Sequence, residues 1–246
     1  MSVAVAPVSI IPSPVEATAA RWHWLYKIGG AAAWLSVVFF PIQIAICLIS
    51  PPPDTVMGWF TLFQNNQFVG LLDLDLLLMV DQVLAILIFL ALYVALRRAN
   101  ESFMAIAFAM ALVSAALFIA SNPAVAMLSL SEQYAAAGTE AQRTILLAAG
   151  QTLLVTWQGS AFQTSYLLGS IAPIIMSVVM LQGCQRVFSR PTAYLGILSN
   201  VIALGLYVPK IGVYISIFSV VFLWVWYILI ARRLFQLGNL IGGGEK

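Results

Sequence analysis

Residues 71–98 read LLDLDLLLMVDQVLAILIFLALYVALRR, and this stretch decides the fold class of the chain. Apart from its aspartates and one glutamine, it is continuously apolar until it ends at Arg97 and Arg98. A membrane-spanning helix needs about 20 mostly apolar residues, and a single helix satisfies its own backbone hydrogen bonds inside lipid. The stretch therefore predicts a long transmembrane helix over 71–96, which we expect to tilt or bend.

Runs of the same kind recur outward from this stretch in both directions. They cover residues 28–49, 103–122, 162–182, 192–208 and 211–231, of which 192–208 is short. The whole chain is 62% hydrophobic and only 8% charged, whereas soluble domains carry about 25% charged residues. We therefore predict an all-α membrane protein, a six-transmembrane-helix bundle with amphipathic helices on its outer face.

The basic residues sort around these runs and predict the orientation. Nine of the eleven lie on the two tails and on alternate loops, and only Arg143 and Lys210 lie on the other side. Basic residues near the ends of spans stay in the cytoplasm. We expect both termini to be cytoplasmic in a bacterial plasma membrane, with a net charge of +6 inside and −4 outside. The basic side suits an anionic lipid leaflet.

The positions of the first and last spans divide the chain into three parts. We expect a disordered cytoplasmic tail over 1–24, a membrane domain over 25–238 and a flexible C-terminal tail over 239–246. Within the membrane domain, the outer loops 50–70 and 123–161 carry the extra mass. Trp59, Phe60 and Phe63 recur at helical spacing in the first loop, which predicts a short helix lying on the outer leaflet.

The second outer loop predicts two helices. Ser129 with Glu132 and Thr139 with Gln142 have the spacing of capping boxes, and Gly138 fits a helix stop between them. An apolar stripe follows the second box, at Leu146, Ala149, Leu153, Leu154 and Trp157. We expect this second helix to lie on the membrane or over the mouth of the bundle.

Small residues predict where spans approach closely in lipid. Gly29 and Gly30 begin the first span, and the span 103–122 is rich in alanine, so we expect that span to lie centrally. Asn200 follows Gly196 by four residues, which predicts a close helix contact with a polar clasp.

Aspartates at the start of 71–96 are the strongest candidates for a functional site. Asp81 lies 16 residues before Arg97, roughly 24 Å along a helix at about 1.5 Å per residue, and so within a hydrocarbon core of about 30 Å. An ionisable group at that depth indicates function by default. Asp73 falls on the same side of the helical wheel, whereas Asp75 points elsewhere. A purely structural carboxyl, bonded to a neighbouring span, is the alternative.

Two further residues complete the candidate ligand or ion site. Gln82 follows Asp81 directly, and Arg143 is the basic residue of the outer helices that could reach Asp73, Asp75 or Glu132. The expected ligand is a small molecule or cation that enters from the outer side.

Catalytic and cofactor motifs are absent from the sequence. His23 is the only histidine, so a Ser-His-Asp triad within the membrane is excluded, and there is no His-Cys cluster for zinc and no axial pair for haem. Phosphate-binding and dinucleotide fingerprints are missing too. We expect no enzyme activity, no cofactor and no nucleic acid partner.

Several stretches resemble one bacterial family of multi-pass membrane proteins. They are SLSEQYAAA from Ser129, EAQR from Glu140, SYLLGSIA from Ser165, FSRPTAYLGIL from Phe188 and WYILIARRLF from Trp226. KIGGAAAWL from Lys27 is similar too. The family is called domain of unknown function 4386, and the resemblance covers about residues 25–238. It implies a bacterial plasma-membrane protein without an assigned activity, and it brings no site residues with it.

Two functions remain open at this stage. The first is an ion or small-molecule binding, transport-like module with an outward-facing acidic cavity. The second is a non-catalytic scaffold or accessory subunit whose spans dock a membrane protein partner, which predicts a lipid-facing stripe of small residues.

Overall fold

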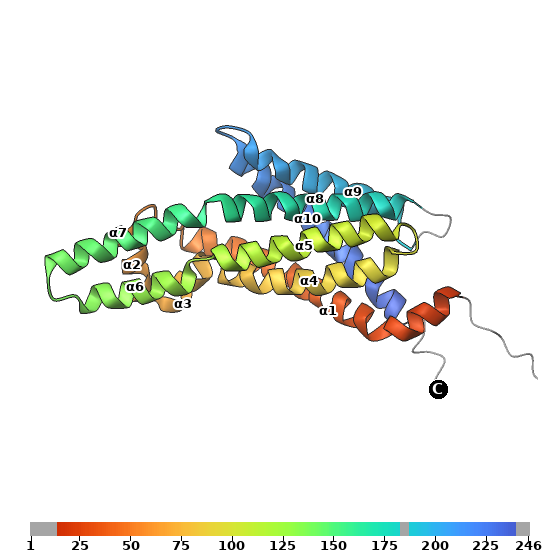
Figure 1. Ribbon diagram of the computed structural model, residues 1–246, viewed down its shortest axis with the longest axis horizontal. Coiled ribbons are helices and arrows are strands. Elements are labelled where there is room, and N and C mark those ends of the chain that lie inside the picture. The colour runs from red at the N-terminus through yellow and green to blue at the C-terminus, as the bar shows by residue number, and fades with distance from the viewer. Residues whose placement is uncertain (1–13, 183–186, 240–246) are drawn as a thin grey trace, which may run out of the picture.

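The computed structural model describes residues 14–182 and 187–239, with side chains from residue 22 onward, and the described residues are helical without a strand. The long helices are α1 (Pro14–Ile49), α4 (Leu76–Leu96), α5 (Glu101–Ser121), α8 (Ser160–Leu181) and α10 (Gly212–Asn239). They pack into an elongated bundle, in which both ends of the described chain lie at the same end of the molecule (Figure 1).

Five helical segments of the described chain are long and apolar enough to cross a membrane, which makes this a membrane-embedded protein. The expected sixth, over 192–208, is instead α9 (Arg190–Ala203), followed by the short 3-10 helix η1 (Leu204–Tyr207). With 14 residues, α9 falls short of a span by length. It lies along α8 and α10 (Figure 1).

The boundaries of the first helix differ from the sequence prediction. α1 begins at Pro14, so residues 14–24 are helical and not part of a disordered tail. Residues 1–13 and 240–246 lie outside the described residues. Near the start of the span, Trp24 is exposed and stacks under the Lys27 ammonium, whereas Tyr26 is buried in the bundle.

The predicted single helix over 71–96 is broken. It consists of α3 (Gln67–Asp73) and α4, separated at Leu74 and Asp75, where Asp75 has the left-handed backbone conformation (φ 62°). Aspartate tolerates this conformation better than most residues. The Leu74 carbonyl accepts a hydrogen bond of 2.7 Å from the Asn122 side-chain amide, so that carbonyl is satisfied although the helix is interrupted there.

Four short helices form a separate unit, here called the outer unit. They are α2 (Val56–Asn65), α3, α6 (Ala124–Ala136) and α7 (Glu140–Trp157), with α6 and α7 continuing α5 and α8 beyond the bundle (Figure 1). The helical segment Glu101–Ala136 has 36 residues, about 54 Å at 1.5 Å per residue. Since this exceeds a hydrocarbon core of about 30 Å, the outer unit must project beyond it.

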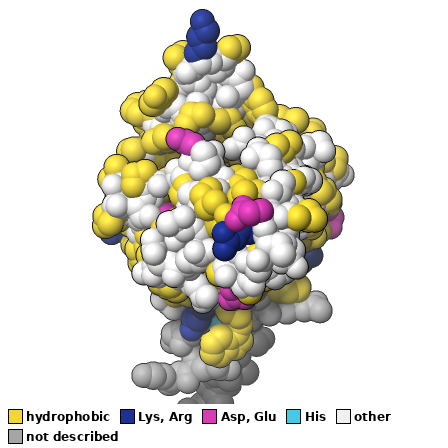
Figure 2. Space-filling model, turned by 90° about the vertical axis from the view of Figure 1, so that its left-hand side faces the viewer, with side chains coloured by type: hydrophobic (Ala, Val, Ile, Leu, Met, Phe, Trp, Pro, Cys, Tyr) yellow, Lys and Arg dark blue, Asp and Glu magenta, His cyan; other side chains and the backbone are white. Residues whose placement is uncertain are grey.

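The outer unit has its own hydrophobic core. Trp59, Phe60 and Phe63 of α2 are at most 2% exposed and pack with Met127 of α6 and with the apolar face of α7. The expectation that this aromatic face lies on the outer leaflet is therefore wrong, because α6 and α7 cover it. Figure 2 looks onto this end of the molecule, where charged side chains lie among polar and hydrophobic ones.

Only one of the two predicted capping boxes begins a helix. Thr139 caps α7 and accepts from the Gln142 amide at 3.2 Å, and the helix before it ends next to Gly138. Ser129 lies inside α6, which begins after Pro123, so the first box is wrong. The predicted apolar stripe of α7 faces the core of the outer unit, through residues that include Leu153, Leu154 and Trp157.

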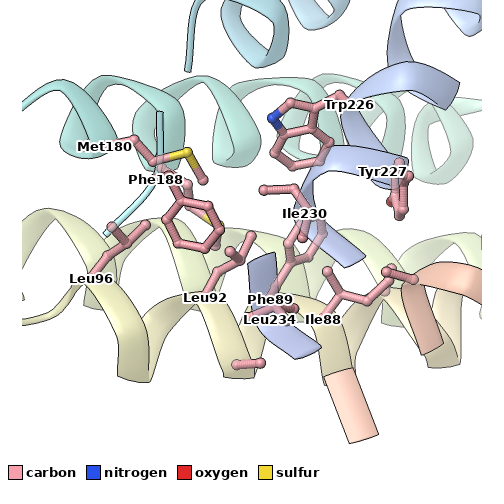
Figure 3. Close-up of a cluster of buried hydrophobic side chains, with 14 of the residues drawn as sticks. Ile88, Phe89, Leu92, Leu96, Met180, Phe188, Trp226, Tyr227, Ile230 and Leu234 are labelled. Carbon is pink, nitrogen blue, oxygen red and sulfur yellow. The ribbon is translucent and has the colours of Figure 1, made fainter. Parts of the chain in front are cut away.

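The core of the bundle fills the space between α4, α8 and α10. Leu92, Met180, Trp226, Ile230 and Leu234 are nearly completely buried and converge there (Figure 3). Phe188, just before α9, also points into this core (Figure 3). The position of α9 is therefore fixed by packing at its first turn.

Small residues mark the closest helix contacts. A Cβ atom on Gly196 of α9 would lie 2.2 Å from Ser177 Oγ and 2.5 Å from Trp226 Nε1, so the predicted close contact is confirmed. Asn200 makes no clasp between helices there, since its amide donates to the Gly196 carbonyl of its own helix. The alanine-rich α5 is not central: its buried residues form one stripe toward its neighbours, and the rest of its surface is more exposed.

Candidate functional site

Polar and small residues recur every seven positions at Gly29, Ser36 and Gln43 of α1 and at Ser50, the residue directly after the helix. Seven residues make about two turns, so the four lie on one face of the helix. This face packs against α4 and α3, because a Cβ on Gly29 would lie 2.6 Å from Ala91 Cβ. We call this contact the α1–α4 seam.

The outer end of the seam is held by hydrogen bonds between side chains of α1 and the segment around α3. Ser50 Oγ donates to Asp73 Oδ2 at 2.9 Å, and Gln43 Nε2 donates to the Leu72 carbonyl at 3.4 Å. Asp73 is only 3% exposed and Gln43 9%. These contacts tie the first helix to the residues just before the break.

Asp81 lies deeper in the same seam. It is 8% exposed, and it faces Ser36, which is fully buried. Tyr227 of α10 lies close by and is also buried. Ser36 is nine residues beyond Lys27, about 13 Å along α1, and 14 residues before Ser50, about 21 Å. The Asp81 carboxyl thus sits well inside the apolar part of the bundle.

Four buried oxygen atoms along this seam have no hydrogen-bond partner among the described residues. They are Ser36 Oγ, Gln43 Oε1, Asp73 Oδ1 and Asp81 Oδ1. Nearly all buried polar groups in proteins are paired, and an unpaired one costs free energy, more so in lipid than next to water. Their concentration in one seam marks it as a place where a further hydrogen-bond donor or a cation would be stabilised.

Asp75 lies at the break, outside the span, and is half-buried. Burial raises the pKa of its carboxyl to about 7, and the negative charge of Asp73 adds to the effect. Burial also raises the pKa of Asp73, although the hydrogen bond from Ser50 opposes this. The two carboxyls beside the break therefore both favour the proton-bound form relative to free aspartate.

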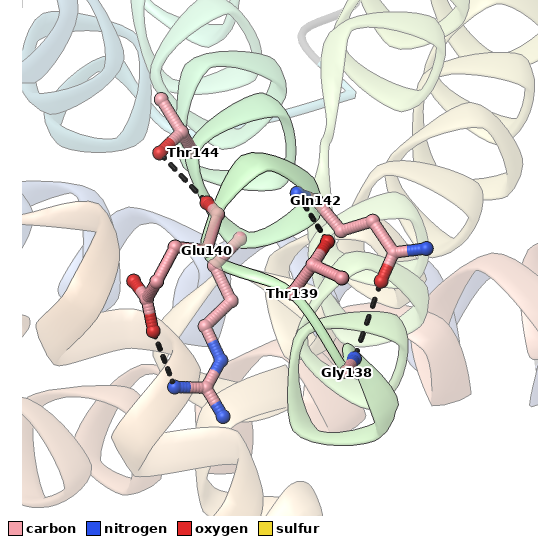
Figure 4. A network of polar contacts seen from close by, with 6 residues as sticks. Gly138, Thr139, Glu140, Gln142 and Thr144 are labelled. Carbon is pink, nitrogen blue, oxygen red and sulfur yellow. Dashed lines mark hydrogen bonds and ion pairs between the residues drawn. The ribbon is translucent and has the colours of Figure 1, made fainter.

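The structure places Asp73 and Asp75 close together at the break and Asp81 deeper in the seam, beside Ser36. The other two candidates do not join them. Gln82 follows Asp81 directly, is half-buried and makes no hydrogen bond within the described part of the chain. Arg143 lies on the first turn of α7, in the outer unit. It pairs with Glu140 at 3.2 Å (Figure 4). It also lies over the Tyr134 ring, so the expected reach to the aspartates or to Glu132 is wrong.

The prediction that Asp73 and Asp81 share a side is confirmed by their common neighbour, α1. The helical-wheel angle between the two residues assumed one continuous helix, whereas the backbone is interrupted at Asp75, so the angle itself does not apply to the structure. Sequence reasoning did not assign Ser36, Gln43 or Ser50 to the site. The seven-residue repeat that they form with Gly29 was the signal that could have found them.

Among the described residues, there is no group of three His, Cys, Asp or Glu side chains that could hold a metal ion. What the seam offers is a set of carboxylate, amide and hydroxyl oxygens. Such oxygens suit a proton, a water molecule or a hard cation.

No family model, curated protein or solved structure matches this chain. Membership of the family that the sequence resembles therefore stays a prediction. The functional argument rests on the seam itself.

Proposed function

We propose that this protein is an ion-binding, transport-like membrane module that takes up a proton or a small cation from its outer side into the α1–α4 seam. The observation that carries the proposal is the set of four buried, unpartnered oxygens along that seam. Asp81 is the innermost carboxyl and the binding group, and Asp73 and Asp75 form the entrance.

The physical reason is the cost of a carboxyl in lipid. An ionised carboxylate at that depth is strongly disfavoured unless it is neutralised, so Asp81 must hold a proton or a cation. Hard cations prefer carboxylate, carbonyl and hydroxyl oxygens. Asp81 and Ser36 supply a carboxylate and a hydroxyl at the inner position, and the Gln43 amide oxygen lies about two turns away along α1, toward Asp73. The outer position of Asp73 and Asp75 concentrates positive ions at the mouth.

Six crossings of a bacterial plasma membrane, with both termini in the cytoplasm, form part of the proposal. Gly238 near the end of α10 lies against Lys27 near the start of α1. The chain must return from the end of α8 to the start of α10, and α9 with η1 provides that return. Several basic residues lie at helix ends on the same side as Lys27, among them Arg97, Arg190 and Arg232. Basic residues near the ends of spans favour the cytoplasmic face, so this side is the cytoplasmic one in the proposal.

Proton uptake into liposomes tests the proposal. The full chain is reconstituted with a pH-sensitive dye inside, and a potassium diffusion potential drives ions inward, with and without external sodium. The wild type should acidify the lumen, or admit sodium, faster than empty liposomes. Asp81→Asn should reduce the flux to the level of empty liposomes, whereas Glu132→Gln, which removes an exposed carboxyl of the outer unit, should retain it.

A chemical label separates binding from flux. A hydrophobic carbodiimide modifies protonated carboxyls in lipid, and mass spectrometry should find Asp81 modified, with protection by the bound cation. If the wild type shows neither flux nor modification while Asp81→Asn unfolds, Asp81 is a structural carboxyl and the proposal fails.

A scaffold or accessory subunit is the second candidate, and one observation favours it. Ala105, Ala109, Ala116 and Ala120 are exposed on α5 and lie within about 60° of one another around the helix. Such a small-residue face allows another helix to approach closely in lipid. Cysteines placed at Ala109 and at Phe103, which is exposed about 120° away around α5, should then differ in crosslinking to a partner in native membranes, with Ala109 the more reactive.

A further inference from the structure

A pocket of about 560 Å³ lies at the end of the bundle opposite the outer unit, between the first turn of α9 and the last turns of α10. Its polar wall includes Ser189, Arg190, Thr192, Arg232, Arg233 and Gln236. None of these residues belongs to the α1–α4 seam, so an inference about the pocket is independent of the proposed ion uptake.

Three arginines dominate the charge of the pocket, and its lining residues in the described part of the chain include no acidic side chain. Arg233 is held in place, since its Nε donates to the Val187 carbonyl and its Nη1 donates to Gln236 Oε1 at 3.1 Å. Arg190 and Arg232 are exposed and form no ion pair with a described carboxylate. Guanidinium groups bind phosphate through paired N–H donors, so the pocket is suited to a phosphate group.

The start of α9 adds to this positive potential. Ser189 caps the helix, and its Oγ accepts from the Thr192 amide at 3.4 Å and lies 2.8 Å from Thr192 Oγ1. The N-terminus of a helix carries a partial positive charge and unpaired N–H groups. Here it faces the same pocket as the arginines.

The remaining wall is apolar and leads toward lipid. Phe188 and Leu229 line the pocket beside the arginines. One to three turns before Leu229, α10 exposes Val225, Val221 and Phe218 on the same side of the helix. A ligand with a phosphate at the arginines could therefore continue as an acyl chain along α10, which a free phosphate cannot do.

We propose that this pocket binds the phosphate of an anionic phospholipid headgroup, with the acyl chains lying on the apolar surface of α10. Basic pockets between membrane helices on the cytoplasmic side recognise such headgroups. The shared chemistry, a phosphate held by arginines, would also suit a soluble phosphorylated compound, and the test below separates the two sources.

Native mass spectrometry of the full chain in a neutral detergent tests the proposal with three probes. They are dioctanoyl phosphatidylglycerol, dioctanoyl phosphatidylcholine and inorganic phosphate. We expect one saturable phosphatidylglycerol per chain, bound at least about tenfold more tightly than phosphatidylcholine, and no competition by phosphate at equal concentration.

Matched variants locate the site. Arg190→Gln with Arg232→Gln should weaken phosphatidylglycerol binding at least about tenfold, because two charged hydrogen-bond donors are lost. Arg97→Gln with Arg98→Gln removes the same charge at the same end of the bundle but outside the pocket, and should leave binding within about twofold. Arg190→Lys with Arg232→Lys keeps the charge and should bind with intermediate strength.

Three results would overturn the proposal. Equal weakening in both glutamine pairs would show general attraction to charge, and no weakening in either would place the lipid elsewhere. Binding of inorganic phosphate that competes with the lipid would assign the pocket to a soluble phosphorylated ligand. Thermal unfolding of each variant shows whether a loss of binding is a loss of fold, and the lysine pair repeats the test if the glutamine pair unfolds.

Discussion

Two helix contacts in the same bundle are both polar but differ in how their polar atoms are satisfied. Between α5 and α8, Ser114 Oγ donates to the Ser165 carbonyl and Ser165 Oγ donates to the Ser114 carbonyl, each at 2.8 Å. In the α1–α4 seam, Ser36 Oγ lies close to the Asp81 carboxyl, but the contact falls short of a regular hydrogen bond. The hydrogen bonds of the first contact are all made within the protein, and it serves packing. The second contact leaves oxygen atoms that could still accept a hydrogen bond or bind a cation.

The lesson concerns how a buried polar residue is interpreted. Polar groups between membrane helices are most often adhesive, and the serines of α5 and α8 are of that kind. A seam that leaves several oxygens unpaired gains little stability from them. Function is then the better explanation of their presence. The predictions below test this difference, beginning with the largest expected effect.

Gly29→Leu should separate α1 from α4 and have the largest effect on stability. A Cβ at this position meets Ala91 Cβ at 2.6 Å and the Leu87 carbonyl at 3.3 Å, and a backbone atom cannot move aside. Overpacking of this kind costs about 1–3 kcal/mol or more, measured as a lower midpoint of thermal unfolding in detergent. Gly138→Leu is the control, because that position opens into free space, and an equal loss there would contradict the prediction.

Ser114→Ala and Ser165→Ala should each destabilise the fold, while Ser36→Ala should not. Hydrogen bonds between membrane helices average about 0.6 kcal/mol, so the double variant should lose roughly 1 kcal/mol, with coupling between the two sites in a double-mutant cycle. Ser36 Oγ loses only its contact with the Asp81 carboxyl, which falls short of a regular hydrogen bond. A loss at Ser36 as large as at Ser114 would remove the difference between the two contacts.

Trp224→Phe should destabilise the protein more when Pro41 is present than when it is replaced. Proline at 41 removes the amide that would normally bond the Val37 carbonyl, and Trp224 Nε1 donates to that carbonyl at 2.8 Å instead. Losing the indole donor should cost about 0.5–1.5 kcal/mol. In a Pro41→Ala background the helix amide replaces it, so the cost of Trp224→Phe should shrink. Unfolding midpoints of the four combinations give the coupling, and additive costs would refute it.

Asp75→Asn should raise stability at alkaline pH but not at acidic pH. Burial raises the pKa of Asp75 to about 7 from its ordinary 3.8, and Asp73 adds to this, so the fold favours the neutral carboxyl. The stability this provides is complete below pH about 4 and is lost as the pH rises through about 7. Asparagine stays neutral and accepts the left-handed backbone.

The measurement is the unfolding midpoint at pH 4.5 and at pH 8. We expect Asp75→Asn to exceed the wild type by about 2–4 °C at pH 8 and to match it more closely at pH 4.5. The exposed Asp54 provides the control as Asp54→Asn. A gain of the same size at both pH values would mean that the carboxyl does not titrate against folding.

The sequence by itself determined the class of the protein. Continuous apolar runs and few charges dictate membrane helices, because lipid offers no partner to an open backbone. Thr139 showed where α7 begins, and Gly196 marked a close contact. Asp81 stood out as a buried carboxyl because its depth follows from simple counting along a helix.

Only the tertiary structure decided what surrounds these residues. The break at Asp75, the covering of the α2 aromatic face by α6 and α7, and the pairing of Arg143 with Glu140 each depend on segments far apart in the chain or on backbone torsions that no local pattern dictates. The same holds for Ser36 opposite Asp81 and for the pocket between α9 and α10. Periodicity along one helix shows which residues share a face, but the neighbour of that face is chosen by packing among all the helices.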